Sequence, residues 1–170
     1  LGVSACAAEE ALDITQDCTF STSYTKLKPS LMHDGKYTTK WVSADRREPY
    51  IEITMPAGVD CYGIYICFAE EPKEWLLQTN ISGEWITLCT MTDEYEHVYI
   101  PLYGLDVLRI YVEDTGKYQD LAVNEIFLFS QGTVPDWVQQ WQPTPEDADI
   151  MFLVAHPDDE LLFFGGAIPT

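Results

Sequence analysis

The chain has 170 residues, and its 9 lysines and arginines against 28 aspartates and glutamates give a formal net charge of −19. Such a charge would repel phosphate backbones and anionic lipid surfaces, which argues against nucleic acids and charged membrane surfaces as partners. The sequence is 46% hydrophobic and 13% aromatic and holds no run of 18 apolar residues, so it predicts a folded core without a membrane span. The length allows one domain, or one domain and a piece of another.

Residues 1–11 form an N-terminal tail that is typical of the cut end of a secretory signal peptide. The small, apolar residues 1–8 are followed directly by two glutamates. Ala5-Cys6-Ala7 fits the pattern of ordinary cleavage, whereas Val3-Ser4-Ala5-Cys6 resembles a lipobox whose cysteine is lipidated. The alternative is an arbitrary boundary, because the charged and apolar regions of a signal are absent. We expect a secreted or cell-surface protein, with lipoprotein anchoring through Cys6 in the lipobox case.

Between residues 13 and 130, short apolar and β-branched runs are broken by turn residues. In the first clear run, Tyr50–Met55, apolar and polar residues alternate, which predicts a half-buried strand. Further strands are predicted at Cys61–Phe68, Trp75–Thr79, Trp85–Met91, His97–Leu102, Val107–Val112 and Ala122–Phe129. Their spacing predicts an all-β sandwich or barrel over residues 12–130.

The cysteine pattern does not decide between disulfide bonds and free thiols. Cys6 aside, Cys18, Cys61, Cys67 and Cys89 are an even number, which allows three disulfide pairings in an oxidising compartment. Cys61 and Cys67 belong to one predicted strand, so both should point to the same face, about 20 Å apart, and cannot bond to each other. Buried free thiols are an equal alternative to two disulfides.

The pattern changes after residue 130. Residues 131–148 contain prolines and little alternation, which predicts a linker that packs on another surface through its two tryptophans. Within residues 149–170, the continuous apolar run Ile150–Ala155 suits a strand covered on both faces of a parallel α/β sheet. The residues from Asp159 onward have the pattern of a first helical turn. We therefore expect the first strand and helix of an incomplete α/β domain.

The turn between this strand and helix has the residue types of a metal-dependent hydrolase. His156 and Asp159 can converge on one divalent ion, and Asp158 can point at a metal-bound water. A metal lowers the pKa of bound water to about 7, and a carboxylate that accepts the proton completes a hydrolytic nucleophile. The alternative is an ordinary helix cap, since a zinc site needs at least three protein ligands and only two are local.

Residues 149–169, with Pro135-Asp136-Trp137 before them, resemble the start of the PIG-L/LmbE-like family of zinc-dependent N-deacetylases, whose opening carries a His-Pro-Asp-Asp-Glu signature. The resemblance implies that His156 and Asp159 bind Zn²⁺ and that Asp158 is the general base. The family's third ligand is a histidine much further along its domain. The only other histidines here lie upstream, in the β region, so the third ligand should lie outside this chain. We expect the parent protein to be a deacetylase and this chain alone to be inactive.

Residues 12–130 resemble the discoidin, or coagulation-factor type C, family of galactose-binding-like domains, which includes family 32 carbohydrate-binding modules. The segments that carry this are Leu31–Trp41, Trp75–Gln78 with Gly83–Trp85, Leu108–Val112 and Val123–Phe127. The resemblance implies an eight-stranded jelly-roll sandwich. It also implies a structural calcium ion near Asp34, Thr39 and Glu125, whose hard oxygen donors suit Ca²⁺. The alternative is that Asp34 is a turn residue and Glu125 a solvated strand residue.

Aromatic side chains in or next to predicted loops are candidates for stacking on a sugar ring. We expect Tyr37, Trp75 and Tyr118 to take this role, with Tyr95 and Tyr103 as further loop aromatics. The other two tryptophans of the β region, Trp41 and Trp85, stand at family positions that pack between the sheets. Arg109 falls inside a strand, and no cluster of polar residues indicates a pocket for hydroxyl groups.

Two classes of function follow. In the first, the sandwich is the accessory, carbohydrate-binding module of a secreted carbohydrate N-deacetylase that acts on an N-acetylated amino sugar, and it docks on the catalytic domain. In the second, the sandwich is a stand-alone glycan-binding or structural docking module without catalysis.

Overall fold

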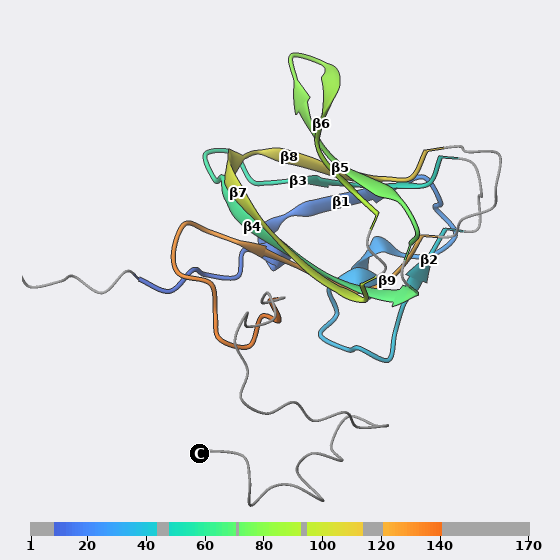
Figure 1. The fold of residues 1–170 in the computed structure, drawn as a ribbon, viewed down its shortest axis with the longest axis horizontal. Coiled ribbons are helices and arrows are strands. Elements are labelled where there is room, and N and C mark those ends of the chain that lie inside the picture. Colours follow the sequence, from blue (N-terminus) through green and yellow to red (C-terminus); the bar gives the residue numbers. More distant parts are fainter. Residues whose placement is uncertain (1–8, 44–47, 71, 93–94, 114–120, 141–170) are drawn as a thin grey trace, which may run out of the picture. The chain divides into compact units, whose positions relative to one another are not determined.

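Two antiparallel β-sheets packed face to face make up the fold (Figure 1). The computed structural model describes residues 9–43, 48–70, 72–92, 95–113 and 121–140. The five-stranded sheet has the order β1-β3-β8-β5-β6, and the four-stranded sheet has the order β2-β9-β4-β7. The elements are η1 (Thr15–Asp17), β1 (Thr19–Thr22), η2 (Pro29–Met32), β2 (Trp41–Val42), β3 (Tyr50–Thr54), β4 (Cys61–Glu70), β5 (Trp75–Ile81), β6 (Glu84–Met91), β7 (His97–Leu105), β8 (Val107–Tyr111) and β9 (Ala122–Phe129), where η marks a 3-10 helix. The predicted all-β sandwich is confirmed.

Alternation along the strands builds the core between the sheets. On β3, Ile51 and Ile53 are fully buried and lie opposite Ile110 and Leu108 of β8. Trp41 is also fully buried, which confirms its predicted place between the sheets. Because each fully buried side chain of this size contributes about 1.5–3 kcal/mol, this interior accounts for most of the driving force for folding.

A bulge near the start of β4 corrects one prediction about the cysteines. The pairing of β4 with β7 shifts register between Cys61 and Gly63. Cys61 therefore packs in the core between the sheets, whereas Cys67 packs in a second cluster with Tyr65 and Phe129. The prediction that Cys61 and Cys67 share a face is wrong, because the regular alternation of side chains is interrupted at this register shift. All four cysteines in the described part of the chain carry free thiols.

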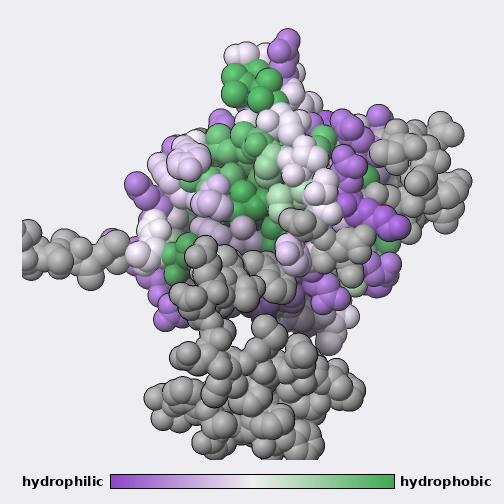
Figure 2. Space-filling model, viewed as in Figure 1, coloured by the Kyte–Doolittle hydropathy of each residue, from purple (hydrophilic) through white to green (hydrophobic). Residues whose placement is uncertain are grey.

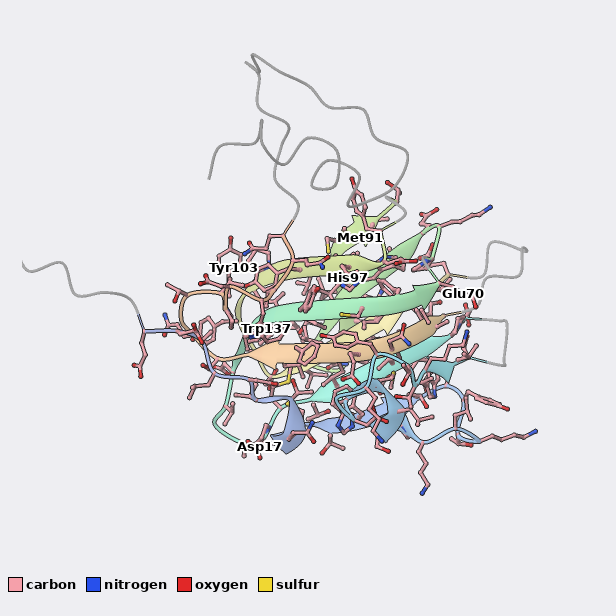
Figure 3. All side chains as sticks on the ribbon, turned by 90° about the horizontal axis from the view of Figure 1, so that it is seen from below. Asp17, Glu70, Met91, His97, Tyr103 and Trp137 are labelled. Carbon is pink, nitrogen blue, oxygen red and sulfur yellow. The ribbon has the colours of Figure 1, made fainter. Side chains whose placement is uncertain are left out.

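Residues 131–140 fold back over the outer face of the four-stranded sheet. Trp137 lies over this sheet (Figure 3). Its ring lies 4.9 Å from the Phe127 ring and 6.0 Å from the Tyr65 ring, centroid to centroid, in edge-on contacts. Val138 is buried in the same cluster. The segment predicted to pack through its tryptophans does so through Trp137, while Trp141 lies outside the described residues.

The first described residues pair with this same segment. Glu10 and Thr133 form a parallel bridge, in which the Thr133 amide donates to the Glu9 carbonyl and the Ala11 amide donates to the Thr133 carbonyl, both at 2.9 Å. The two ends of the described domain are therefore fixed side by side.

The hairpin of β5 and β6 projects beyond the other strands (Figure 1). Its two-residue turn, Ser82-Gly83, has positive φ at both positions, and the Asn80 side chain accepts a hydrogen bond from the Gly83 amide at 2.9 Å. Hydrophobic side chains at this end face solvent, with Ile81 58% and Ile86 42% exposed (Figure 2). None of the helices in the described ranges is long and apolar enough to cross a membrane.

Candidate functional site

The hydrolase motif cannot be placed, because His156, Asp158 and Asp159 lie outside the described residues, as does Tyr118. The two described histidines have other contacts. His97 Nδ1 lies 2.8 Å from the Tyr65 hydroxyl oxygen, and the His33 ring stacks on the Phe20 ring at 4.6 Å. Within the described ranges, no three His, Cys, Asp or Glu side chains form a group that could hold a metal ion.

Asp34, Thr39 and Glu125, the residues predicted to hold calcium, come together where the loop after η2 meets β9. The Lys36 amide donates to Glu125 Oε1 at 2.8 Å and to Asp34 Oδ1 at 3.0 Å. The Thr39 hydroxyl lies 2.9 Å from Asp34 Oδ1 and 2.9 Å from the Lys36 carbonyl oxygen. Two carboxylates thus flank one backbone amide, with a hydroxyl beside them.

The pKa values of the two carboxyl groups are shifted in opposite directions. Burial raises the pKa of Glu125, the Asp34 carboxylate adds to this rise, and hydrogen bonds from the loop amides oppose it. Partial desolvation acts to raise the pKa of Asp34, but hydrogen bonds from Thr39 and the Lys36 amide outweigh it and lower that pKa. Glu125 is therefore a buried acid that would gain from a nearby cation.

The atoms of this cluster that could coordinate a metal ion are all hard oxygen atoms. Besides the two carboxylates and the hydroxyl, the loop supplies the carbonyl oxygens of Lys36 and Thr39. The Asn124 side-chain amide donates to the Thr39 carbonyl at 2.7 Å and so fixes the loop against β9. This donor set fits Ca²⁺, which takes six to eight oxygen ligands in flexible geometry, and it does not suit zinc, which prefers nitrogen and sulfur ligands.

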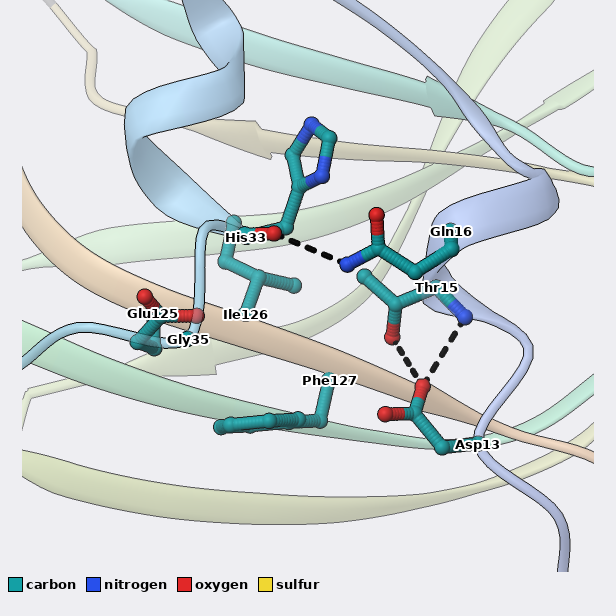
Figure 4. A pocket seen from close by; sticks show the side chains of 8 residues that line it. All are labelled: Asp13, Thr15, Gln16, His33, Gly35, Glu125, Ile126 and Phe127. Atoms are coloured by element: carbon teal, nitrogen blue, oxygen red, sulfur yellow. Dashed lines mark hydrogen bonds between the residues drawn. The ribbon is translucent and has the colours of Figure 1, made fainter.

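A small cavity of about 150 Å³ lies next to the cluster, between η1, the end of η2 and β9 (Figure 4). Its walls include Asp13, Gln16, Glu125 and the Phe127 ring. The Thr15 amide donates to Asp13 Oδ1 at 2.9 Å, and the Gln16 side-chain amide donates to the His33 carbonyl at 2.8 Å. These bonds tie both polar side chains to the cavity wall.

The predicted sugar-stacking residues have different surroundings. Tyr37 is 55% exposed on the loop between η2 and β2, so its ring can meet a ligand. Trp75 is only 1% exposed and packs edge-on against Phe68, with ring centroids 5.3 Å apart. The prediction that Trp75 stacks on a sugar is therefore wrong, because its side chain points between the sheets. Tyr95 packs against the core, and Tyr103 is 93% exposed on β7.

Sequence reasoning missed a group on the outer face of the five-stranded sheet. The Arg109 guanidinium carbon lies 4.2 Å from the Tyr111 ring centroid, 4.9 Å from that of Trp85 and 5.2 Å from that of Tyr50. Trp85 is half-buried here, so its predicted place between the sheets is wrong. Alternation within the predicted strands would have assigned Tyr111 and Arg109 to one face, but it does not reveal which strands are neighbours.

Comparison with solved structures shows that the sandwich shares its fold with carbohydrate-binding modules. Chitosan-binding module 1 from a chitosanase/glucanase of Paenibacillus sp. IK-5 matches with a TM-score of 0.59 and 18% identity, over 70% of this chain and 99% of that chain. The family 32 module of Clostridium perfringens NanJ, solved in complex with galactose, matches with a TM-score of 0.58 and 13% identity, over 71% and 99%. A Ruminococcus gnavus GH29 fucosidase in complex with fucose matches over 70% of this chain and 26% of its own length, with a TM-score of 0.59 and 15% identity.

No protein-family model matches the chain, and a search of curated proteins finds no relative. The likeness therefore rests on the arrangement of the strands.

Proposed function

We propose that this sandwich is a carbohydrate-binding module, and that the glycan it binds contains an N-acetylated amino sugar. The observation that carries the proposal is the match to two carbohydrate-binding modules over nearly their whole length. Exposed aromatic rings such as those of Tyr37 and Tyr103 offer surfaces on which a pyranose can stack.

The test is a glycan array probed with the full chain, followed by calorimetry with the glycans that bind. We expect binding to oligomers that contain N-acetylglucosamine or N-acetylgalactosamine. Binding only to sugars without an acetamido group would contradict the ligand class and leave carbohydrate binding intact. Failure to bind any glycan would favour a structural docking module.

We further propose that the module belongs to a secreted, zinc-dependent carbohydrate N-deacetylase. The support is the sequence from His156 to Glu160, which follows the sandwich in the chain. Zinc, when bound, supplies a water whose pKa is lowered to about 7. In this proposal His156 and Asp159 hold the ion, together with a histidine outside this chain. Asp158 accepts the proton of the attacking water.

Acetate release by the parent protein tests this second proposal. Asp158→Ala should abolish turnover on an N-acetylated sugar and leave zinc content unchanged, because Asp158 is assigned to proton transfer and not to metal binding. Unchanged turnover in that variant would refute the base assignment. Glu160→Gln is the matched control, since it removes a neighbouring carboxylate that has no proposed role.

We also propose that Ca²⁺ binds at Asp34, Thr39 and Glu125 and has a structural role. The support is the set of oxygen donors around the buried Glu125 carboxyl group. A further role of the sandwich is suggested by residues 131–140, where Trp137 and Val138 pack on the four-stranded sheet. In this proposal the sandwich also docks on the catalytic domain.

A further inference from the structure

The outer face of the five-stranded sheet carries a row of polar side chains at its centre. Glu52 of β3, Arg109 of β8 and Gln78 of β5 are direct cross-strand partners. Their neighbours along the strands, Ile51, Ile110 and Leu77, are fully buried in the core. The three polar side chains therefore all point away from the core, within reach of one another.

Aromatic rings surround the central residue of this row. The rings of Tyr50, Trp85 and Tyr111 all lie within 5.2 Å of the Arg109 guanidinium carbon, which is the range of cation–π contacts. Lys40–Glu70 is the only ion pair within the described ranges, so no carboxylate described in the structure forms an ion pair with Arg109. The described contacts of its guanidinium group are therefore mainly with aromatic rings.

Two polar atoms of this group have no hydrogen-bond partner. Gln78 is only 7% exposed, and its side-chain NH₂ donates to the Thr87 hydroxyl at 3.2 Å, but its Oε1 accepts nothing. Arg109 Nε is buried and donates to nothing. Leaving a buried donor or acceptor unpaired costs about 1–3 kcal/mol, so one unpaired donor and one unpaired acceptor on adjacent strands call for a ligand that supplies both.

We propose that this face is a second binding site, for a neutral pyranose of a glycan chain, distinct from the cluster at Asp34. The inference rests on the proposed carbohydrate binding for its ligand class. A sugar hydroxyl both donates and accepts, so neighbouring hydroxyls can pair with Arg109 Nε and Gln78 Oε1. The aromatic rings beside them provide the stacking surface for the pyranose ring.

The same row favours a neutral sugar over an acidic one. A carboxylate has only acceptor atoms, and Gln78 Oε1 and the Glu52 carboxylate, both acceptors, belong to the cross-strand partners on either side of Arg109. The carboxylate of a uronate could not donate to Gln78 Oε1 and would be repelled by the Glu52 carboxylate. We therefore expect a neutral ligand.

Access to the two buried atoms depends on Trp85. This residue lies on β6, the edge strand of the sheet, and is half-buried. In the proposal its ring shifts when a pyranose enters, so that the hydroxyls reach Arg109 and Gln78. Binding should therefore change the tryptophan fluorescence of the protein, and Trp85→Phe should remove that change.

Calorimetry on the full chain tests the site with three probes: β-1,4-linked N-acetylglucosamine and galactose hexamers as neutral glycans, and a galacturonate hexamer as the acidic one. We expect a neutral hexamer to bind and the galacturonate hexamer not to bind. Gln78→Met should weaken neutral binding at least tenfold with little change in the melting temperature. The variant has a similar volume, and the unpaired acceptor that it removes offsets the lost hydrogen bond to Thr87. Gln131→Met, at an exposed glutamine, is the matched control and should bind as the native chain does.

Each outcome decides between the two proposals. Neutral binding that survives both Gln78→Met and Arg109→Lys would overturn this site and leave carbohydrate binding elsewhere intact. Preference for the galacturonate hexamer would overturn the neutral ligand class. Glycan-array hits that exclude both neutral hexamers would also overturn this site, whereas absence of binding to every glycan would overturn the proposed function itself.

Discussion

Calcium should stabilise the sandwich, and this stabilisation should depend on Glu125. The structure holds the Glu125 carboxyl group 1% exposed, with Asp34 beside it and the Lys36 amide shared between the two. Burial and like charge both disfavour the ionised pair, and a bound divalent cation offsets both effects. Glu125→Gln keeps an oxygen that can accept the Lys36 amide proton and removes one charge. It should fold without calcium and lose most of its response to calcium.

The size of the effect follows from linkage. Extracellular modules bind Ca²⁺ with dissociation constants of about 10⁻⁴ to 10⁻³ M. At about 10 mM Ca²⁺ the ion then stabilises the folded state by about 1.4 to 2.7 kcal/mol. For a domain of this size, at about 4 °C per kcal/mol, the melting temperature should rise by about 6 to 11 °C.

Thermal unfolding followed by circular dichroism, with EDTA or with calcium, measures this shift. Magnesium at the same concentration is the control ion, because it demands near-ideal octahedral geometry and should give a much smaller rise. Asp60→Asn, at an exposed carboxylate, is the control variant and should keep the full calcium response. Equal shifts with both ions, or a full calcium shift in Glu125→Gln, would refute the assignment of the site.

Three further predictions concern packing and thiol chemistry. Gly63→Ala would place its Cβ 2.6 Å from the Tyr99 hydroxyl oxygen, so denaturant titration should show a loss of about 1–3 kcal/mol, and Tyr99→Phe should recover part of it. Trp137→Ala should lower stability by about 3 kcal/mol at most, because its ring is half exposed, and faster proteolysis after residue 130 should accompany the loss. Burial raises the pKa of Cys61 and Cys67 to about 11, so labelling with a thiol reagent should be slow at pH 8 and accelerate as the pH approaches 11. Fast labelling of both thiols at pH 8 in the native protein would contradict that assignment.

The strands were predictable from the sequence where one face is buried and the other is exposed to solvent. Runs such as Tyr50–Met55 and Ala122–Phe129 became β3 and β9 within a residue or so, because burial of alternate side chains leaves a period of two in the sequence. The short strands β1 and β2 were missed. Three polar residues around Phe20 in β1, and only two residues in β2, carry no such period. The face of Cys67 was also missed, because a bulge shows no sign in the sequence.

The residues of the candidate sites could likewise be predicted only in part from local sequence patterns. Glu125 lies far along the sequence from Asp34 and Thr39, and only the resemblance to a known family pointed to their meeting. The group around Arg109 was missed because its members come from three strands whose order in the sheet is not sequential. Trp75 was assigned to the surface because it follows a loop, although its side chain is the first inward position of β5. Cross-strand neighbours, and the direction of the first side chain after a loop, are the information that local patterns lack.

The parallel bridge between Glu10 and Thr133 also determines how the domain resists mechanical force. The two segments run in the same direction, so tension applied at the two ends of the domain pulls them along their axes in opposite senses. The two amide–carbonyl bonds between Glu9, Ala11 and Thr133 are then sheared together and do not open one after the other. A domain pulled at these two ends should therefore resist the force through both bonds at once before its sheets separate.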